Sequence, residues 1–483
     1  MNKTPQRSSR KKHSRPAITT TATINYLNSD GVGVARHENK ELLVAGTLPT
    51  EEVKVTIEHQ GQRRSIGHLT QLLKKSDQRV IPGCSLSDNC PGCPLIHMGY
   101  PYQLRYKEQT ILTALRTYPS LKQLNLNKIL AAQETFGYRT TAKLAVAKHQ
   151  GKASIGLYKR GTHEVVDIGN CPQQHPLINK VVQAVREEIE KQDVYVYNPI
   201  TRRGLLRYLA VRVSPANNKA LVTLVCAQRN YREMTHLAKW IKKKVPEIIG
   251  VHQNINASSG NVVFGTTTVK ILGGSDLIDT IGDIRLRLSP SSFFQVNHAQ
   301  ASRIYHLVRD WADLNQKDTA VDLYCGVGGI AMHLASSGGK IIGIEINPEA
   351  IYNAKAAAQL NNLNNCRFIA EDASIAIKNI QEEVGTITAG IVNPPRSGCD
   401  EEVLTTLTSL NPQRLIYVSC NPTSLARDLD ILSRMGYVAV ELQPVDMFPQ
   451  TPHVESVVRL IKSTDKWSSK KENNGDKEGV PQR

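Results

Sequence analysis

The sequence predicts an α/β protein with a small N-terminal β-barrel, a central α+β domain with a cysteine cluster, and a C-terminal Rossmann-like domain. Three observations lead to this prediction. Residues 17–75 alternate apolar and polar positions between glycine-rich turns, which is typical of short strands. The segment GCSLSDNCPGC places three cysteines within ten residues. From residue 289 onward, apolar runs alternate with helical segments, as in a parallel sheet covered on both faces.

The length of the chain also indicates several domains. At 483 residues it is too long for one hydrophobic core, and typical domain sizes suggest about three. We expect a helix over about residues 102–130 to pack on the C-terminal domain. The predicted parts are a basic disordered arm (1–16), the barrel (17–75), the central domain (76–288), the C-terminal domain (289–462) and a polar disordered tail (463–483).

The charge of the chain indicates a polyanionic partner. The net charge is +17 and the pI is near 9.4, and such a balance favours nucleic acid. The first sixteen residues carry six Lys or Arg and no acid, yet without them the chain still carries +11. No stretch reaches the roughly 18 uncharged residues that cross a bilayer. We therefore expect a cytoplasmic protein with no membrane partner, and nothing in the sequence implies an obligate protein partner.

Five apolar runs in the C-terminal region end in polar or glycine-rich sequence. They read TAVDLYCGVGG, KIIGIEINPE, CRFIAEDA, AGIVNPPRSG and RLIYVSCNP. In an open parallel sheet, ligands bind beyond the carboxyl ends of the strands, so these termini should converge on one crevice. The residues expected around this common pocket are Asp322, Glu345, Asp372, Asn393 and Cys420.

The turn after the first of these runs has the pattern of a cofactor-binding loop. It contains GxGxxA from Gly326 onward, and Glu345 follows Asp322 by twenty-three residues, at the end of the next run. A carboxylate there can accept hydrogen bonds from two ribose hydroxyls, which both NAD and S-adenosylmethionine provide. The acids Asp322 and Asp372 favour a sulfonium cation over a pyrophosphate. The alternative for each acid is a helix cap.

Six ordered motifs resemble those of the S-adenosylmethionine-dependent RNA uracil-5-methyltransferases. They read SSFFQVN, DLYCGVGG, GIEINPEAI, NPPRSG, VSCNP and MFPQTPHVESVV. The resemblance covers about residues 17–462, and it implies that the C-terminal domain is a class I methyltransferase domain that acts on RNA. Residues 17–75 resemble a TRAM domain, an RNA-binding barrel. The alternative for this segment is a β module that has no ligand.

The resemblance also assigns chemical roles. Methylation of carbon 5 of uracil requires prior addition at carbon 6, for which a thiolate is well suited, and the family's cysteine nucleophile falls on Cys420. The general base that removes the carbon 5 proton falls on Glu455. Alone, Cys420 would be read as an inert core cysteine and Glu455 as a surface acid. The cofactor-binding residues implied are Gln295, Tyr324, Gly329, Glu345, Asp372 and Asn393.

Two residues depart from the commonest family pattern and bear on the RNA target. Gly329 stands where many members have Asn, and Asn393, which carries no charge, stands where many have Asp. Both departures resemble RlmC-like 23S rRNA enzymes, whereas the TRAM-like module resembles RlmD-like ones. We therefore expect 23S rRNA as the target, with tRNA second.

Two further interpretations come from other classes of protein. One is a DNA cytosine-5-methyltransferase, whose nucleophile typically follows Pro, whereas Ser419 precedes Cys420 here. The other is a non-catalytic RNA-binding or ribosome assembly protein. A binding module needs neither Cys420 nor Glu455, so both residues count against this second interpretation.

The cysteine cluster has the spacing of a metal site. Cys84, Cys90 and Cys93 form a C-x5-C-x2-C arrangement, and Cys171 follows far downstream. Four thiolates can hold zinc or an iron-sulfur cluster, and the spacing alone does not separate the two. A reducing cytoplasm argues against disulfides. The family resemblance implies a structural 4Fe-4S cluster on these four residues. The cysteines expected in the core are Cys226, Cys325, Cys366 and Cys399.

Overall fold

The computed structural model describes residues 18–260 and 262–463. The arm predicted over residues 1–16 and the tail from residue 464 lie outside the described residues. The chain divides into two compact units. Of the described residues, one unit comprises 18–88, 93–103 and 450–452, and the other comprises 89–92, 104–260, 262–449 and 453–463. No helix in the described part of the chain is long and apolar enough to cross a membrane.

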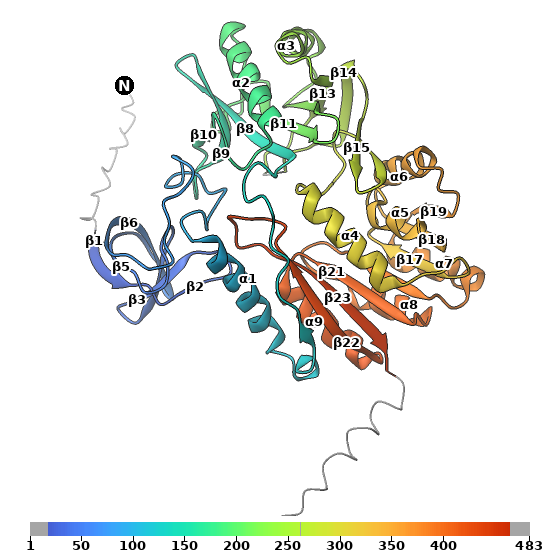
Figure 1. Cartoon of the computed structure of the whole chain (residues 1–483). Helices are drawn as coiled ribbons and strands as arrows, with labels where there is room; N and C mark the ends of the chain where they lie inside the picture. The colour runs from blue at the N-terminus through green and yellow to red at the C-terminus, as the bar shows by residue number, and fades with distance from the viewer. Residues whose placement is uncertain (1–17, 261, 464–483) are drawn as a thin grey trace, which may run out of the picture. The chain divides into compact units, whose positions relative to one another are not determined.

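The first unit contains one six-stranded sheet in the order β1-β5-β6-β4-β3-β2 (Figure 1). In β5, buried Val53 and Val55 alternate with exposed neighbours and pack with Leu42 and Ile24. This alternation is the one that the sequence predicted, and the N-terminal part is rich in strands, as expected. The strands are β1 (Ile18–Thr23), β2 (Tyr26–Leu27), β3 (Gly33–His37), β4 (Lys40–Val44), β5 (Glu52–Gln60) and β6 (Arg64–Lys74).

The central part of the second unit contains a seven-stranded sheet in the order β10-β9-β8-β11-β12-β13-β14. β12 and β13 are parallel, and the other neighbours are antiparallel. The two helices here are α2 (Pro176–Lys191) and α3 (Tyr231–Lys244). The strands are β8 (Thr141–His149), β9 (Lys152–Tyr158), β10 (Val165–Asp167), β11 (Leu206–Ser214), β12 (Lys219–Cys226), β13 (Ile248–Ile255) and β14 (Thr267–Gly273).

A hairpin of β15 (Leu277–Ile281) and β16 (Ile284–Leu288) leads into an eight-stranded sheet in the order β19-β18-β17-β20-β21-β23-β22-β7. Strands β17 to β21 are parallel, and β23 runs antiparallel to β21 and to β22. The strands are β7 (Asn125–Leu126), β17 (Thr319–Leu323), β18 (Lys340–Glu345), β19 (Cys366–Ala370), β20 (Ala389–Val392), β21 (Arg414–Ser419), β22 (Tyr437–Val445) and β23 (Glu455–Lys462).

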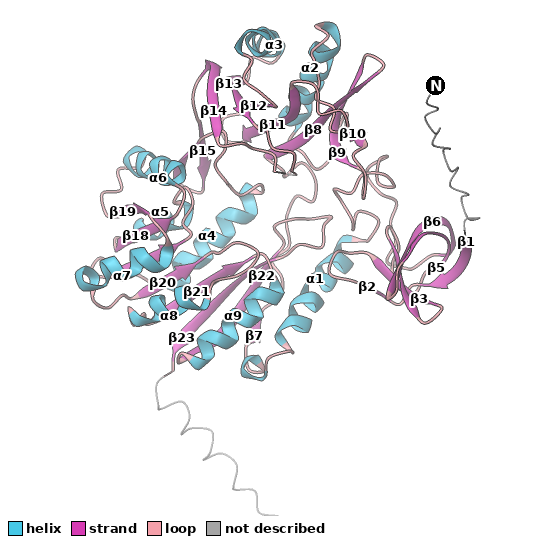
Figure 2. Cartoon of the chain, turned by 180° about the vertical axis from the view of Figure 1, so that it is seen from behind, coloured by secondary structure: helices cyan, strands magenta, loops and turns pink. Residues whose placement is uncertain are grey.

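Helices cover both faces of this sheet (Figure 2). One buried cluster joins α4, α5 and α6 to side chains such as Ala320 and Ile341, and another joins α1, α7, α8 and α9 to Val321 and Ile342. The predicted α/β architecture with a Rossmann-like C-terminal domain is therefore confirmed. The helices are α4 (His298–Ala312), α5 (Gly329–Ala335), α6 (Pro348–Leu360), α7 (Ala373–Val384), α8 (Glu401–Ser409) and α9 (Pro422–Arg434).

The segment before the central sheet also contributes to the C-terminal sheet. α1 (Tyr100–Leu115) and the short 3-10 helix η1 (Pro119–Leu121) precede β7, the edge strand beside β22. Ile111 and Leu115 of α1 lie in the same hydrophobic cluster as Leu404 and Leu425. Asn127 N–H donates to the carbonyl of Leu442 over 2.9 Å. The segment thus packs on the C-terminal sheet as expected, but the predicted helix over 102–130 ends at Leu115, and η1 and β7 follow it.

Candidate functional site

The carboxyl ends of the parallel strands bring the predicted pocket residues to one edge of the sheet. Glu345 is the last residue of β18, and Asp322 is the next-to-last residue of β17. Asn393 directly follows β20, and Cys420 directly follows β21. Since these strands are neighbours in the order β18-β17-β20-β21, the sequence order reverses between β17 and β20. Such a switch point is where open α/β sheets bind ligands.

The turn after β17 has an open stretch of backbone at this edge of the sheet. Tyr324 has a φ of 59°, Gly326 of 56° and Gly328 of 80°, values that favour glycine. A Cβ atom added at Gly326 would meet no other atom within 4 Å. The N–H of Gly326 donates to Oε2 of Glu345 over 3.2 Å, and the N–H of Asn347 donates to Oε1 over 2.9 Å. The loop therefore holds the carboxylate of Glu345 beside an open stretch of backbone.

Asp322 is a buried carboxyl group without a hydrogen-bond partner in the described chain. Burial raises its pKa to about 8, and the nearby charge of Glu345 also raises it. The N–H of Ala331 favours the charged form without reaching hydrogen-bond geometry. A buried carboxyl group that lacks a partner is costly, and a cation would stabilise its ionised form. The site therefore fits the positively charged sulfonium and amino groups of S-adenosylmethionine.

Asp372 serves in part as the helix cap that the sequence allowed as an alternative. Its Oδ1 accepts hydrogen bonds from Ser374 N–H over 2.9 Å and from Ser374 Oγ over 2.8 Å at the start of α7. The hydrogen bond from the Ser374 side chain, the largest cause, lowers the pKa of Asp372. Its second oxygen is not used by the cap.

The structure gives a physical reason for Gly329. A Cβ atom added there would lie 2.9 Å from the hydroxyl oxygen of Tyr305, closer than real Cβ contacts. A side chain at position 329 therefore requires Tyr305 to shift. Two other expected cofactor residues, Gln295 in the loop before α4 and Tyr324 after β17, are half-buried.

The thiol of Cys420 lies near an acid and a cation that shift its pKa in opposite directions. Burial, and then the carboxylate of Glu455, raises the pKa of Cys420, whereas the charge of Arg396 and its hydrogen bond to the thiol lower it. A cation is the group that raises the thiolate fraction of a cysteine. Arg396 is thus the neighbouring cation that the sequence alone did not identify, although it lies in the NPPRSG motif.

Polar contacts from α9 hold the loop that carries Arg396. Asn421 Nδ2 donates to the carbonyl of Arg396 over 2.9 Å, and Arg427 donates to the carbonyl of Ser397 over 2.9 Å. Asp428, which is fully buried, accepts a hydrogen bond from Cys399 N–H over 2.8 Å. These contacts fix the backbone at Arg396 and in the residues that follow it, and the guanidinium of Arg396 reaches Cys420.

Glu455 is the first residue of β23, and its side chain is only 5% exposed. Burial raises its pKa to about 8, and the charge of Arg396 acts against this rise. The acid is therefore protonated in the free site at neutral pH, and the ionised base becomes available as pH rises through about 8. A base with a pKa near the working pH suits proton transfer.

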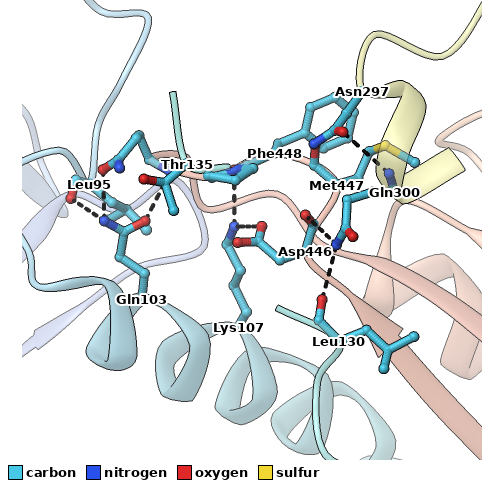
Figure 3. A network of polar contacts seen from close by, with 12 residues as sticks. Leu95, Gln103, Lys107, Leu130, Thr135, Asn297, Gln300, Asp446, Met447 and Phe448 are labelled. Atoms are coloured by element: carbon cyan, nitrogen blue, oxygen red, sulfur yellow. Dashed lines mark hydrogen bonds and ion pairs between the residues drawn. The ribbon is translucent and has the colours of Figure 1, made fainter. Parts of the chain in front are cut away.

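A buried ion pair anchors the chain that leads from β22 toward Glu455. Lys107 Nζ pairs with Asp446, and neither side chain is exposed (Figure 3). Lys107 Nζ also donates to the carbonyl of Phe448 over 3.0 Å. From α4, Asn297 Nδ2 donates to the carbonyl of Met447 over 3.1 Å, and Gln300 Nε2 donates to that of Asp446 over 3.0 Å. Three consecutive carbonyl groups are therefore held by side chains distant in sequence.

The structure describes all four predicted cluster cysteines. Cys84, Cys90, Cys93 and Cys171 are all half-buried. Within residues 18–260 and 262–463, no group of three or more His, Cys, Asp or Glu side chains is arranged to hold a metal ion. The four thiols have the chemistry of iron-sulfur ligands.

Comparison with known proteins agrees with this geometry. A family model described as tRNA (uracil-5-)-methyltransferase matches residues 99–463. An uncharacterized RNA methyltransferase of Geobacter sulfurreducens is 43% identical over 440 residues, which cover 91% of this chain and 89% of the relative. A similar protein of Oceanobacillus iheyensis is 34% identical over 441 residues, which cover 91% of this chain and 96% of the relative.

A solved structure is similar over nearly the same range. The Pyrococcus abyssi tRNA (uracil-54, C5)-methyltransferase, in complex with S-adenosyl-L-homocysteine, matches with a TM-score of 0.72 and 27% identity. The match covers 91% of this chain and 99% of that one. Fold, pocket and similarities together define a class I, S-adenosylmethionine-dependent RNA methyltransferase. More particularly, the chain belongs to the RNA uracil-5-methyltransferase family.

The Lys107–Asp446 pair generates a stability prediction. Lys107→Met leaves the buried carboxylate of Asp446 without its cation, which typically costs about 3–5 kcal/mol. We expect the free energy of unfolding in urea to fall by this amount. As a control, Lys378→Met removes a lysine whose pair with Glu402 is exposed on both sides, and it should change stability by less than about 1 kcal/mol. Equal, small effects in both variants would show that the buried pair does not stabilise the fold.

Proposed function

We propose that this protein transfers a methyl group from S-adenosylmethionine to carbon 5 of a uridine in RNA, through a covalent bond between Cys420 and carbon 6. The observation that carries the proposal is the convergence of Cys420, Arg396 and Glu455, whose charges act on one another beyond the end of β21. A nucleophile, a cation and a largely buried acid are the groups that this reaction requires. An RNA-binding or assembly protein without activity would need none of them in this arrangement.

Each residue has a defined role in the proposed reaction. The Cys420 thiolate, favoured by Arg396, adds to carbon 6, and the electron pair of the 5,6 double bond makes carbon 5 nucleophilic. When bound, S-adenosylmethionine supplies the methyl group. The Glu455 carboxylate then takes the proton from carbon 5. The carbon–sulfur bond breaks, the double bond re-forms, and Cys420 leaves as a thiolate. The order assigns Cys420 to the first step and Glu455 to a later one.

The cofactor site is proposed along β17 and β18. Glu345 is positioned to accept hydrogen bonds from ribose hydroxyls, and Asp322 to face a cationic group. The open backbone at Gly326 allows close approach. Gln295, Tyr324, Gly329, Asp372 and Asn393 complete the proposed set, on the basis of the motifs in which they lie.

The proposed RNA target is 23S rRNA, with tRNA as the second candidate. Gly329, Asn393 and the strand-rich N-terminal part support the first, through their resemblance to 23S rRNA enzymes. The solved Pyrococcus relative, named for a tRNA uridine, favours the second. Mapping 5-methyluridine in 23S rRNA and tRNA from a deletion strain distinguishes them. We expect loss at a 23S rRNA position, and loss confined to tRNA would reject the preferred target.

The two catalytic roles predict opposite failures. Cys420→Ala should abolish methyl transfer and also the covalent adduct with RNA that contains 5-fluorouridine, because fluorine cannot be removed as a proton. Glu455→Gln should still permit addition and methyl transfer, so that an adduct accumulates with ordinary uridine. Denaturing gel electrophoresis of labelled RNA measures both. An adduct in Cys420→Ala, or normal turnover in Glu455→Gln, would remove that residue from the mechanism.

A 4Fe-4S cluster on Cys84, Cys90, Cys93 and Cys171 is proposed from the family resemblance and from the chemistry of four thiols. We assign it a structural role, and no step of the reaction depends on it. Anaerobically purified protein should contain iron and sulfide and lose both on Cys90→Ser. Cys226→Ser, which changes a buried cysteine outside the set, serves as the control. Zinc without sulfide in the unaltered protein would contradict the proposal.

A further inference from the structure

One face of the central sheet carries a cationic pocket that the proposed reaction does not use. Strand β11 lies between β8 and β12. Its residue Ala210 lies opposite Lys143 of β8 and Thr223 of β12. Its residue Arg212 lies opposite Thr141 of β8 and Leu221 of β12. Residues directly opposite each other point to the same face of a sheet. These side chains therefore share one face, and they line a cavity of about 10 Å³ together with Phe264 and Pro290.

Arg212 lies at this cavity with unused hydrogen-bond donors. Its side chain is only 6% exposed, and one guanidinium nitrogen donates to the carbonyl of Ser292. The other two nitrogens, Nε and Nη1, have no partner in the described part of the chain. Buried donors without a partner are rare in proteins and call for a ligand, a water or an ion.

A second cation lies beside Arg212 on the neighbouring strand. Burial, and then the charge of Arg212, lowers the pKa of Lys143. Its Nζ lies 4.9 Å from the ring centroid of Phe264, and its side chain reaches the surface. The carboxylate of Asp279 influences Arg212 from a distance, but its hydrogen-bond partners are His298, Ser214 Oγ and the N–H of Thr280. Neither Lys143 nor Arg212 has an ion pair within residues 18–260 and 262–463.

The size and charge of the cavity decide which ligand fits it. About 10 Å³ is room for one oxygen-sized atom, which is too little for a nucleobase. A water molecule would satisfy the free donors of Arg212, but it would not offset the repulsion between the two cations. A phosphate oxygen would accept hydrogen bonds from Arg212 and would also offset the repulsion between the two cations, because a charged acceptor forms strong hydrogen bonds with guanidinium and ammonium groups.

We propose that Arg212 and Lys143 form a binding site for one backbone phosphate of the RNA substrate. The inference rests on the proposed function, because it takes RNA as the substrate. RNA is favoured as the source of the phosphate because the chain is strongly basic and its family acts on RNA. Pro290 and Ser292, which border the site, belong to the loop that continues to Gln295 and α4. A phosphate held here would therefore be bound beside the segment that enters the catalytic domain.

Salt dependence of RNA binding tests this site. Binding of fluorescein-labelled oligouridine is measured by anisotropy over a range of KCl concentrations. Lys143→Met and Arg212→Gln should each weaken binding about ten-fold at low salt. Each should also reduce the slope of log affinity against log salt by about 0.7, the value for one phosphate on a single strand. The matched control Lys378→Met, which removes an exposed charge on α7, should keep the slope of the unaltered protein.

Each outcome decides the proposal. Arg212 could instead only support the loop through Ser292. In that case Arg212→Gln lowers the melting temperature, while Arg212→Gln and Lys143→Met both keep the slope of log affinity against log salt of the unaltered protein. This result rejects the phosphate site. If Arg212→Gln does not fold, Lys143→Met decides alone, because its side chain is exposed. The unaltered protein is also tested for its adduct with RNA containing 5-fluorouridine. An adduct together with unchanged slopes overturns the phosphate site alone, whereas absence of the adduct overturns the proposed function.

Discussion

The site depends on one guanidinium group between a thiol and a buried carboxyl group. Burial raises the pKa of both Cys420 and Glu455, and the charge of Glu455 further disfavours the thiolate form of Cys420. Arg396 is the cation that favours both charged forms. Without this cation, the pKa values of the nucleophile and of the base would be raised further. The contacts from α9 that hold the loop of Arg396 are therefore part of the chemistry as well as of the fold.

The need to position Glu455 explains why distant segments meet at the end of β22. The chain after β22 leads to Glu455 at the start of β23, and contacts to other segments hold this chain in place. The pair of Lys107 with Asp446, and the donors Asn297 and Gln300, fix three successive carbonyl groups (Figure 3). α1 thus contributes a buried cation to the catalytic domain, although it precedes the central sheet in sequence.

The fold of the C-terminal domain could be predicted because its strands are apolar runs with polar ends, and such runs are visible in the local sequence. The strand β7 could not be predicted, because two residues are too few to show an alternation of apolar and polar positions. The placement of Asp322, Glu345 and Cys420 at strand ends also followed from sequence.

Other features depend on contacts between residues far apart in the chain. Lys107 and Asp446 are separated by 339 positions, and no local pattern relates them. The conflict of a side chain at position 329 with Tyr305, and the pairing of Arg212 with Thr141, likewise arise only when strands and helices pack. Arg396 was visible in a motif, but its effect on Cys420 required the folded loop.

The central claim is that methylation occurs at carbon 5 of uridine and removes the proton there. The most direct measurement uses RNA with tritium at carbon 5 of uridine and counts both the tritium released to water and the methyl groups transferred by the purified protein. The account predicts equal amounts of the two. Methyl transfer without tritium release would place the methyl group elsewhere on the RNA and contradict the account.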